Sequence, residues 1–335
     1  MKKVAIIIPI HATKKNNRLK YFNETLNSVK IQDYPNLVTL VVDDGSEDKV
    51  KNTIKKMSDT KVIRREKSAN ELNTASIAQN YGIDYIFSSS KFNDVEYITF
   101  LHSDDMLFSN TSISDRINLF KRGDKIYGKQ KTGLVFTDMI RFSNNKKNKK
   151  LVKRDYSYKM TLADNQLVND IQRIRRNIWV KSRKGIVPYL TQVYRKKILI
   201  EVHKNLGYNN YSKYGFFDSQ LNTAEDKEAA LQCLKTCELK QYGIITSNMI
   251  TVMYRVHKNS SSWFTKKILK NKVREKNGKR IANRHLSNHN KIKKELLYRE
   301  RLSRGWIYNG NQNLLKKSLE YAWNIYSKIN PKLSI

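Results

Sequence analysis

Short apolar runs alternate with amphipathic stretches along about the first 120 residues of the chain. Residues 4–8 form a continuous apolar run rich in β-branched side chains, which predicts a strand buried on both faces. Further strands are predicted at 36–42, 62–63 and 95–101, and the stretches between them carry apolar residues at helical spacing. This alternation predicts βαβ units, and therefore an α/β fold with an open, mostly parallel sheet flanked by helices.

The second half of the chain has a less regular pattern. Strands are predicted at 133–138 and 244–255, and a helix is predicted at 225–239. The polar, Lys-rich stretch 143–155 is expected to form a mobile loop. From residue 265 onward the chain is basic and carries helical but no strand signals, so a helical C-terminal extension is expected.

Size and composition narrow the class of protein. The 335 residues are 39% hydrophobic, which is enough for a sizeable core in one large domain or two ordinary ones. The two cysteines cannot form a disulfide framework or fill a zinc site alone, and they fit a reducing compartment. Neither a secretory signal nor an apolar run of about 18 residues is present, so a cytoplasmic location is expected.

Positive charge is concentrated in two segments. The formal net charge is +35, and residues 141–210 and 264–335 together carry +29 of it. Such a surface indicates an anionic partner, which could be nucleic acid, anionic lipid headgroups or phosphorylated substrates. The alternative is that much of this lysine is simply solvated surface in a chain rich in Asn, Ile and Ser.

Polar clusters follow three of the predicted strands. They are Pro9 to His11, Asp43 to Ser46, and His102 to Asp105. Ligands of an open parallel sheet bind beyond the carboxyl ends of its strands. Asp104 and Asp105 offer the oxygen ligands that Mg²⁺ or Mn²⁺ takes when it bridges phosphates, although an Asp at such a place can also cap the next helix.

Two later clusters have weaker signals. Glu225 and Asp226 open the predicted helix, where acidic residues are also favoured by the helix dipole alone. His257 follows the last predicted strand, within Tyr254 to Ser260, where a lone His is often an ordinary surface residue. Phosphate-loop, dinucleotide-binding and serine-hydrolase motifs are absent from the sequence.

Taken together and in order, these clusters resemble the family 2 glycosyltransferases, which have the GT-A fold. The likeness covers about residues 2–262 and is strengthened by Gln32 to Asn36 ahead of the second cluster. It implies a Rossmann-like nucleotide-sugar half at about 1–120 and an acceptor half at about 121–262. The basic helical extension expected at 263–335 lies outside the likeness. The motifs that carry it are Pro9-Ile10-His11, Val41-Val42-Asp43-Asp44-Gly45-Ser46, Ala78-Gln79-Asn80-Tyr81-Gly82, Leu101-His102-Ser103-Asp104-Asp105, Ala224-Glu225-Asp226 and Tyr254-Arg255-Val256-His257.

The resemblance implies an inverting transfer of a sugar from a nucleotide diphosphate, with a UDP-sugar favoured as donor. Asp44 would hold the nucleobase, and Pro9 and His11 would line the same pocket. The acceptor would be a hydroxyl of a glycan, a lipid-linked glycan or a protein.

The same resemblance assigns the chemical roles. Asp104 and Asp105 would hold Mn²⁺ or Mg²⁺ against the donor, with Asp105 the more direct ligand, and His257 would reach the diphosphate or its metal. Asp226 would be the catalytic base. Glu225, adjacent to it, is the next candidate for that role.

This chain departs from the family pattern at three places. His102 stands where the metal motif often begins with another Asp, so one carboxylate is missing. Gln79, expected at the donor site, stands where many members have Arg. Ala230 to Cys233 replaces a Leu-Trp-x-Arg run that faces the acceptor, so the acceptor cannot be carried over from the family.

Other functions compete with this one. The charge favours a nucleic-acid-binding protein, but the acidic clusters lie in the near-neutral part of the chain, where a duplex would be repelled. A nucleotidyltransferase shares the sheet and the metal carboxylates, yet the residues after the first strand lack its Gly-rich or basic signature. A non-catalytic relative of the family is disfavoured because Asp104, Asp105 and Asp226 are all present. The extension at 264–335 could bind an anionic membrane or pack on the catalytic domain.

Overall fold

The computed structural model describes residues 1–14, 16, 18–57, 60–66, 75–145, 148–153, 167–168, 189–206, 212–221, 225–255, 257, 277, 280–281 and 284. Its strands form one sheet in the order β3-β2-β1-β4-β9-β6-β10-β5, with β7 paired to β6 and β8 paired to β10. The strands are β1 (Lys3–Ile10), β2 (Leu37–Asp44), β3 (Lys61–Arg65), β4 (Val95–Phe100), β5 (Met106–Leu107), β6 (Thr132–Asn145), β7 (Asn148–Lys153), β8 (Leu167–Val168), β9 (Gln192–Arg195) and β10 (Gly243–Arg255). The α-helices are α1 (Arg18–Lys30), α2 (Asp48–Met57), α3 (Ala75–Ser88), α4 (Ser112–Tyr127), α6 (Lys196–Lys204) and α7 (Glu225–Lys240), and the short 3₁₀ helices are η1 (Ser90–Phe92) and η3 (Tyr189–Thr191).

The first four strands confirm the expected α/β organisation. β1 lies between β2 and β4 and pairs with both in parallel, with Ile7 opposite Leu40 on one side and Phe100 on the other. β3 continues the parallel pairing outside β2. The strand order changes direction at β1, so the carboxyl ends of β1, β2 and β4 meet at the point where ligands of such sheets bind.

The second half of the sheet is mixed. β9 runs antiparallel to both β4 and β6, whereas β10 runs parallel to β6 and antiparallel to β5. The expected loop at 143–155 is wrong in its first part, because β6 continues to Asn145 and pairs with β7 in an antiparallel hairpin. Ladder hydrogen bonds join backbone groups, so such a hairpin forms without the apolar alternation that sequence patterns detect.

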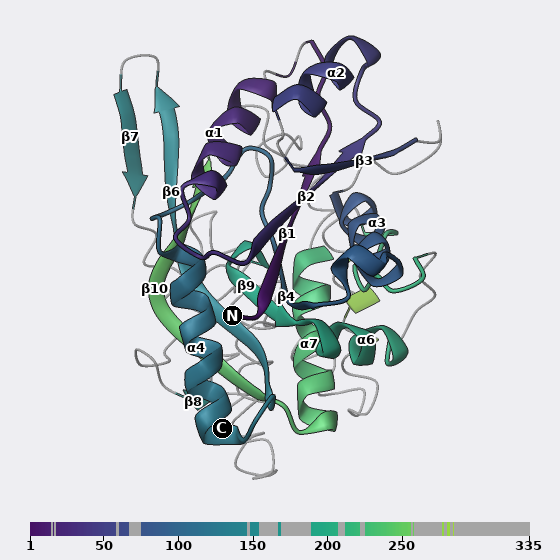
Figure 1. Ribbon diagram of the computed structural model, residues 1–335, viewed down its shortest axis with the longest axis vertical. Coiled ribbons are helices and arrows are strands. Elements are labelled where there is room, and N and C mark those ends of the chain that lie inside the picture. Colours follow the sequence, from purple (N-terminus) through teal and green to yellow (C-terminus); the bar gives the residue numbers. More distant parts are fainter. Residues whose placement is uncertain are drawn as a thin grey trace, which may run out of the picture.

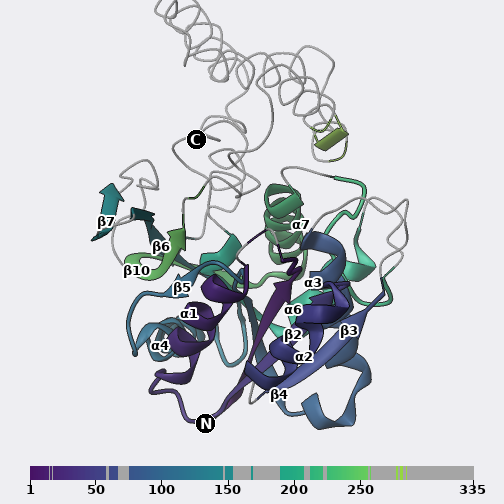
Figure 2. The same cartoon turned by 90° about the horizontal axis from the view of Figure 1, so that it is seen from above.

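Helices cover both faces of the sheet. Helices α1 and α4 lie on one side, and α3, α6 and α7 lie on the other (Figure 1). The view from above shows the same two groups with the sheet between them (Figure 2). Helix α3 packs closely because Gly82 has no side chain: an added Cβ would lie 2.7 Å from Ile7 Cγ2 and 3.0 Å from Val42 Cγ2.

Part of the C-terminal extension is described. Residues 277, 280, 281 and 284 are helical, and Ile281 is fully buried in the same apolar core as β1 and α7. Among the described residues, no helix combines the length and the hydrophobicity needed to cross a membrane.

Candidate active site

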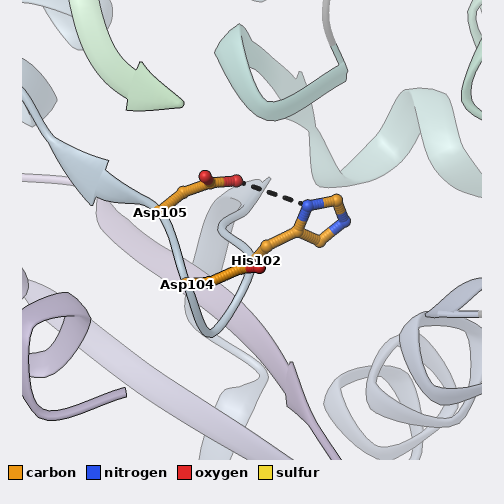
Figure 3. A group of neighbouring side chains, drawn as sticks. All are labelled: His102, Asp104 and Asp105. Atoms are coloured by element: carbon orange, nitrogen blue, oxygen red, sulfur yellow. Dashed lines mark ion pairs between the residues drawn. The ribbon is translucent and has the colours of Figure 1, made fainter. Parts of the chain in front are cut away.

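The turn after β4 gathers the acidic side chains that the sequence predicted as metal ligands. The Asp105 amide donates to the carbonyl of His102 at 3.1 Å, which folds the four residues back on themselves. His102, Asp104 and Asp105 each offer one ligand atom, and these atoms lie within 4.8 Å of one another. Figure 3 shows the Asp105 carboxylate directed toward the His102 ring, with Asp104 on the same turn.

Asp105 is the most deeply buried of these residues, at 1% exposure. Its Oδ1 accepts a hydrogen bond from the Arg255 amide at 2.7 Å. Its Oδ2 has no hydrogen-bond partner of good geometry among the described residues and forms a long ion pair with His102, whose Nδ1 lies 3.4 Å away. Burial, together with the negative charge of Asp104, raises the pKa of the Asp105 carboxyl. A buried carboxylate oxygen without a donor is costly, so Asp105 Oδ2 fits a site for a divalent cation.

Asp104 has the opposite electrostatic setting. Burial alone would raise its pKa, but the hydrogen bond from His257 and the positive charge of Arg18 outweigh burial and lower the pKa. His257 Nε2 lies 2.8 Å from Asp104 Oδ2, and Arg18 forms an ion pair with the same oxygen. Asp104 is therefore held ionised, while its neighbour is held closer to neutrality.

Arg255 and Arg18 contact the turn after β4, and the sequence analysis did not single them out. The buried Arg255 guanidinium donates from Nε to the Asp104 carbonyl at 2.6 Å and from Nη2 to Glu24 Oε2 at 2.9 Å. It lies over the rings of Tyr21 and Phe142, 4.5 and 4.4 Å from their centroids. The sequence could have indicated Arg255, because this residue ends a predicted strand and belongs to the Tyr254–His257 motif. No such signal marks Arg18.

The ends of β1 and β2 form a second group. His11 Nδ1 lies 2.9 Å from the Asp44 carbonyl, and Ser46 Oγ accepts from the Ala12 amide at 2.9 Å. Pro9 is buried in β1 opposite Val42. The structure thus brings together the residues predicted to line a nucleobase pocket.

Two arginines of β3 neutralise the carboxylates of this second group. Arg65 Nε lies 2.7 Å from Asp44 Oδ1, and Arg64 Nη1 lies 2.8 Å from Asp43 Oδ2. Gly45 adopts a φ of 65°, which a glycine adopts without strain, and this conformation turns the chain after Asp44. A ligand group that hydrogen-bonds Asp44 therefore shares the carboxylate with Arg65.

The remaining predicted residues lie on two helices. Gln79 is buried on α3. Glu225 and Asp226 open α7, and burial raises the pKa of Glu225 to about 7, with the negative charge of Asp226 adding to the shift. The charge of His102 acts on Glu225 in the opposite direction, so the first turn of α7 is within Coulombic reach of the turn after β4.

The fold and this site define a class of α/β protein. Its open sheet reverses strand order at β1, as in nucleotide-binding sheets, and acidic residues lie beyond the strand ends at that point. The family model of "Glycosyl transferase family 2" matches residues 5–201. The chain belongs to that family.

Individual relatives agree with this assignment. An "Uncharacterized glycosyltransferase" of Rickettsia felis is 33% identical over 108 residues, which cover 32% of this chain and 16% of that protein. The chain thus spans a small part of that relative. The structure of S. aureus TarS 1–349 shares the fold, with 19% identity, a TM-score of 0.56, and coverage of 92% of this chain and 72% of that one. Its complex with UDP aligns at 18% identity and a TM-score of 0.54, with the same coverage of both chains.

Proposed function

We propose that this protein is an inverting glycosyltransferase that moves a sugar from a nucleotide diphosphate, with a UDP-sugar the first donor to test, to a hydroxyl of an acceptor. The observation that carries the proposal is the turn after β4, where Asp105 Oδ2 lies buried without a hydrogen-bond donor among the described residues, beside Asp104 and His102. Membership in glycosyl transferase family 2 supports the reaction class. The UDP bound to S. aureus TarS supports the choice of nucleotide.

Donor binding is assigned to the ends of β1, β2 and β4. His11 and Asp44 are held against each other by the 2.9 Å contact between the His11 ring and the Asp44 carbonyl, so they would contact the nucleobase as a unit. Asp104 and Asp105 would hold Mn²⁺ or Mg²⁺, with His257 beside them. When bound, the ion supplies positive charge that stabilises the departing diphosphate. Arg18 adds a fixed positive charge beside Asp104.

Proton transfer is assigned to the first turn of α7. Two adjacent carboxylates cannot easily both ionise in a poorly solvated site. With a pKa of about 7, Glu225 carries the proton over much of the neutral range, so we assign the role of base to its neighbour Asp226. Asp226 would accept the proton of the acceptor hydroxyl as that oxygen attacks the face of the sugar opposite the leaving group. Such assistance contributes about 10²–10⁴-fold in rate.

The acceptor remains a glycan, a lipid-linked glycan or a protein. We also propose that the basic extension meets an anionic membrane surface, because residues 264–335 carry 19 basic and 4 acidic side chains with aromatic residues among them. Docking there would bring a lipid-linked acceptor to the enzyme.

A donor screen tests the proposed reaction. The full chain with MnCl₂ would be offered a panel of nucleotide sugars, and slow release of nucleotide diphosphate would be measured for each. We expect one donor to be hydrolysed by the wild type and by Asp94→Asn, an exposed site paired with Lys3, but not by Asp105→Asn. Release of pyrophosphate from nucleoside triphosphates, with no hydrolysis of any nucleotide sugar, would instead identify a nucleotidyltransferase.

A further inference from the structure

A cluster of buried charges, formed by Asp218, Glu228 and Arg284, lies at the start of α7, outside the groups described above. Asp218 and Glu228 are 1% and 0% exposed. Arg284 Nη1 lies 2.7 Å from Asp218 Oδ2 and 3.3 Å from Glu228 Oε1, so one guanidinium nitrogen pairs with both carboxylates. Buried carboxylates are stable only when cations and hydrogen bonds compensate their lost hydration. Arg284 is therefore part of how these two acids are accommodated.

Arg284 comes from the C-terminal extension, and the residues around it dock on one face. Asn277, Arg280, Ile281 and Arg284 are helical, and their spacing of three, four and seven residues places them on one side of a helix. Ile281 is fully buried in the core, and Asn277 is also buried. Arg280 Nε lies 3.6 Å from Asp218 Oδ2, and its guanidinium also hydrogen-bonds Gln220.

The two carboxylates bound by Arg284 stand on either side of residues 222–224. Asp218 belongs to the segment 212–221, and its Oδ1 also accepts from the Gln220 amide at 2.9 Å. Glu228 lies in the first turns of α7, three residues after Glu225, and its Oε1 accepts from Gln232 at 3.0 Å. Arg284 thus fixes the start of α7 against the segment that precedes it.

Helix α3 holds the other end of that segment. The Asn80 side chain pairs with both backbone groups of Phe217, donating to its carbonyl at 2.8 Å and accepting from its amide at 3.0 Å. Asp84 accepts from Ser212 at 2.7 Å and from the Tyr214 amide at 2.6 Å. The segment is therefore clamped between α3, from the donor half, and the extension.

We propose that Arg284 is a positioning residue for Glu225 and Asp226, so that the C-terminal extension forms part of the active site. The inference rests on the proposed function in one respect, the role of Asp226 as base. By bridging Asp218 and Glu228, Arg284 holds the first turn of α7 in the orientation that presents Asp226 to the acceptor. Small displacements of a reacting group lower rates strongly, because the geometry of attack is exacting.

The test begins with hydrogen exchange on the full chain without ligand. Arg284→Met keeps the bulk of the side chain and removes its charge. We expect exchange to accelerate about ten-fold or more in 212–221 and 225–232, while β1 and β4 keep their protection. Lys240→Met is the matched control, because Lys240 lies at the far end of α7 and forms a long ion pair with Glu201, at 3.7 Å. It should change neither region.

Kinetics separate positioning from general stabilisation. With the nucleotide sugar selected by the donor screen, Arg284→Met should lower kcat about ten-fold or more, while calorimetric binding of UDP with MnCl₂ stays unchanged. Arg284→Lys, which keeps the charge without the planar fork, should recover part of kcat.

Each other outcome is decisive. Unchanged exchange at the start of α7, equal acceleration in all segments, or a wild-type kcat in Arg284→Met would overturn the proposal. If Arg284→Met does not fold, the same comparison is made with Arg284→Lys, where wild-type exchange at the start of α7 together with wild-type kcat would overturn it. If no nucleotide sugar is hydrolysed by the wild type, the proposed function fails, and the exchange comparison still decides whether Arg284 holds α7.

Discussion

The backbone amide of Arg255 donates to Asp105 Oδ1 at 2.7 Å, across 150 positions of sequence. The Arg255 side chain reinforces this contact by donating from Nε to the Asp104 carbonyl at 2.6 Å. The end of β10 therefore sets the shape of the turn after β4. Through Glu24 Oε2 it also ties that turn to α1.

Replacing Arg255 with Met should destabilise the fold and disturb the carboxylate turn. The variant removes the donor to the Asp104 carbonyl and the cation paired with Glu24. Because the guanidinium is buried and Glu24 is partly hydrated, we expect a loss of about 2–3 kcal/mol in the free energy of unfolding. Urea titration measures this. Glu24→Gln keeps an acceptor for Arg255 and should cost less than half as much, and equal costs for the two variants would contradict the account.

Glu225→Gln should gain stability over the wild type as the pH rises. The folded-state pKa of Glu225 is raised to about 7 from an ordinary value of 4.5. The stability that the wild type gains from protonated Glu225 is therefore fully present below about pH 4.5 and is lost as the pH rises through about 7. The Gln variant resembles the protonated form at all pH values. We expect the Tm of Glu225→Gln minus that of the wild type to increase by about 2 °C or more from pH 5 to pH 8.

The control for this measurement is Glu238→Gln, near the other end of the same helix. Its Tm difference from the wild type should not change in this way with pH. A Glu225→Gln difference that stays constant from pH 5 to pH 8 would show that Glu225 does not titrate in this window.

Asp226→Asn should separate donor binding from transfer. The amide is nearly isosteric with the carboxylate but cannot accept the proton of the acceptor. We expect turnover to fall by about 10²-fold or more, with UDP affinity within a few-fold of wild type. Glu225→Gln should lose less activity. Wild-type turnover in Asp226→Asn would move the base to another residue, with Glu225 and Asp218 the next to test.

The parts of the fold that could be predicted share a physical cause. Strands buried on both faces, such as β1, are continuous apolar runs, so they are visible in the sequence. Their carboxyl ends coincide with polar turns such as Asp43 to Ser46, and parallel strands bring such ends to one edge. The placement of His102, Asp104 and Asp105 at this edge followed from that rule, whereas the role of Asp226 came only from the family resemblance.

The parts that could not be predicted depend on contacts distant in sequence. Arg18, Arg255 and Arg284 are a few among 65 Lys and Arg residues, and nothing local marks a basic residue that is buried. Their acidic partners are recognisable only after the fold brings them close, as with Arg255 and Glu24. The β6–β7 hairpin was missed because the end of β6, at residues 143–145, is polar in sequence and β7 is Lys-rich.

The membrane proposal is tested by sedimentation with vesicles. We expect the full chain to sediment with vesicles that contain phosphatidylserine at low salt and to be released at high salt, since each basic residue near such a surface contributes about 1 kcal/mol. A chain ending at residue 290 keeps the docked residues Asn277, Arg280, Ile281 and Arg284 and should be released at lower salt. Failure of the full chain to bind anionic vesicles at low ionic strength would mean that the charge of the extension is solvated surface.

Calorimetric titration of UDP, with MnCl₂ or with EDTA, into the wild type, Asp105→Asn and Asp94→Asn tests the central claim most directly. Asp105→Asn replaces the carboxylate whose Oδ2 lies buried without a hydrogen-bond donor among the described residues, whereas Asp94 is exposed and remote from the turn. We predict that Mn²⁺ strengthens UDP binding by about ten-fold or more in the wild type and in Asp94→Asn, a difference of about 1.4 kcal/mol, and has no effect in Asp105→Asn. Equal UDP affinity with Mn²⁺ and with EDTA in the wild type, or an undiminished effect of Mn²⁺ in Asp105→Asn, would contradict the account.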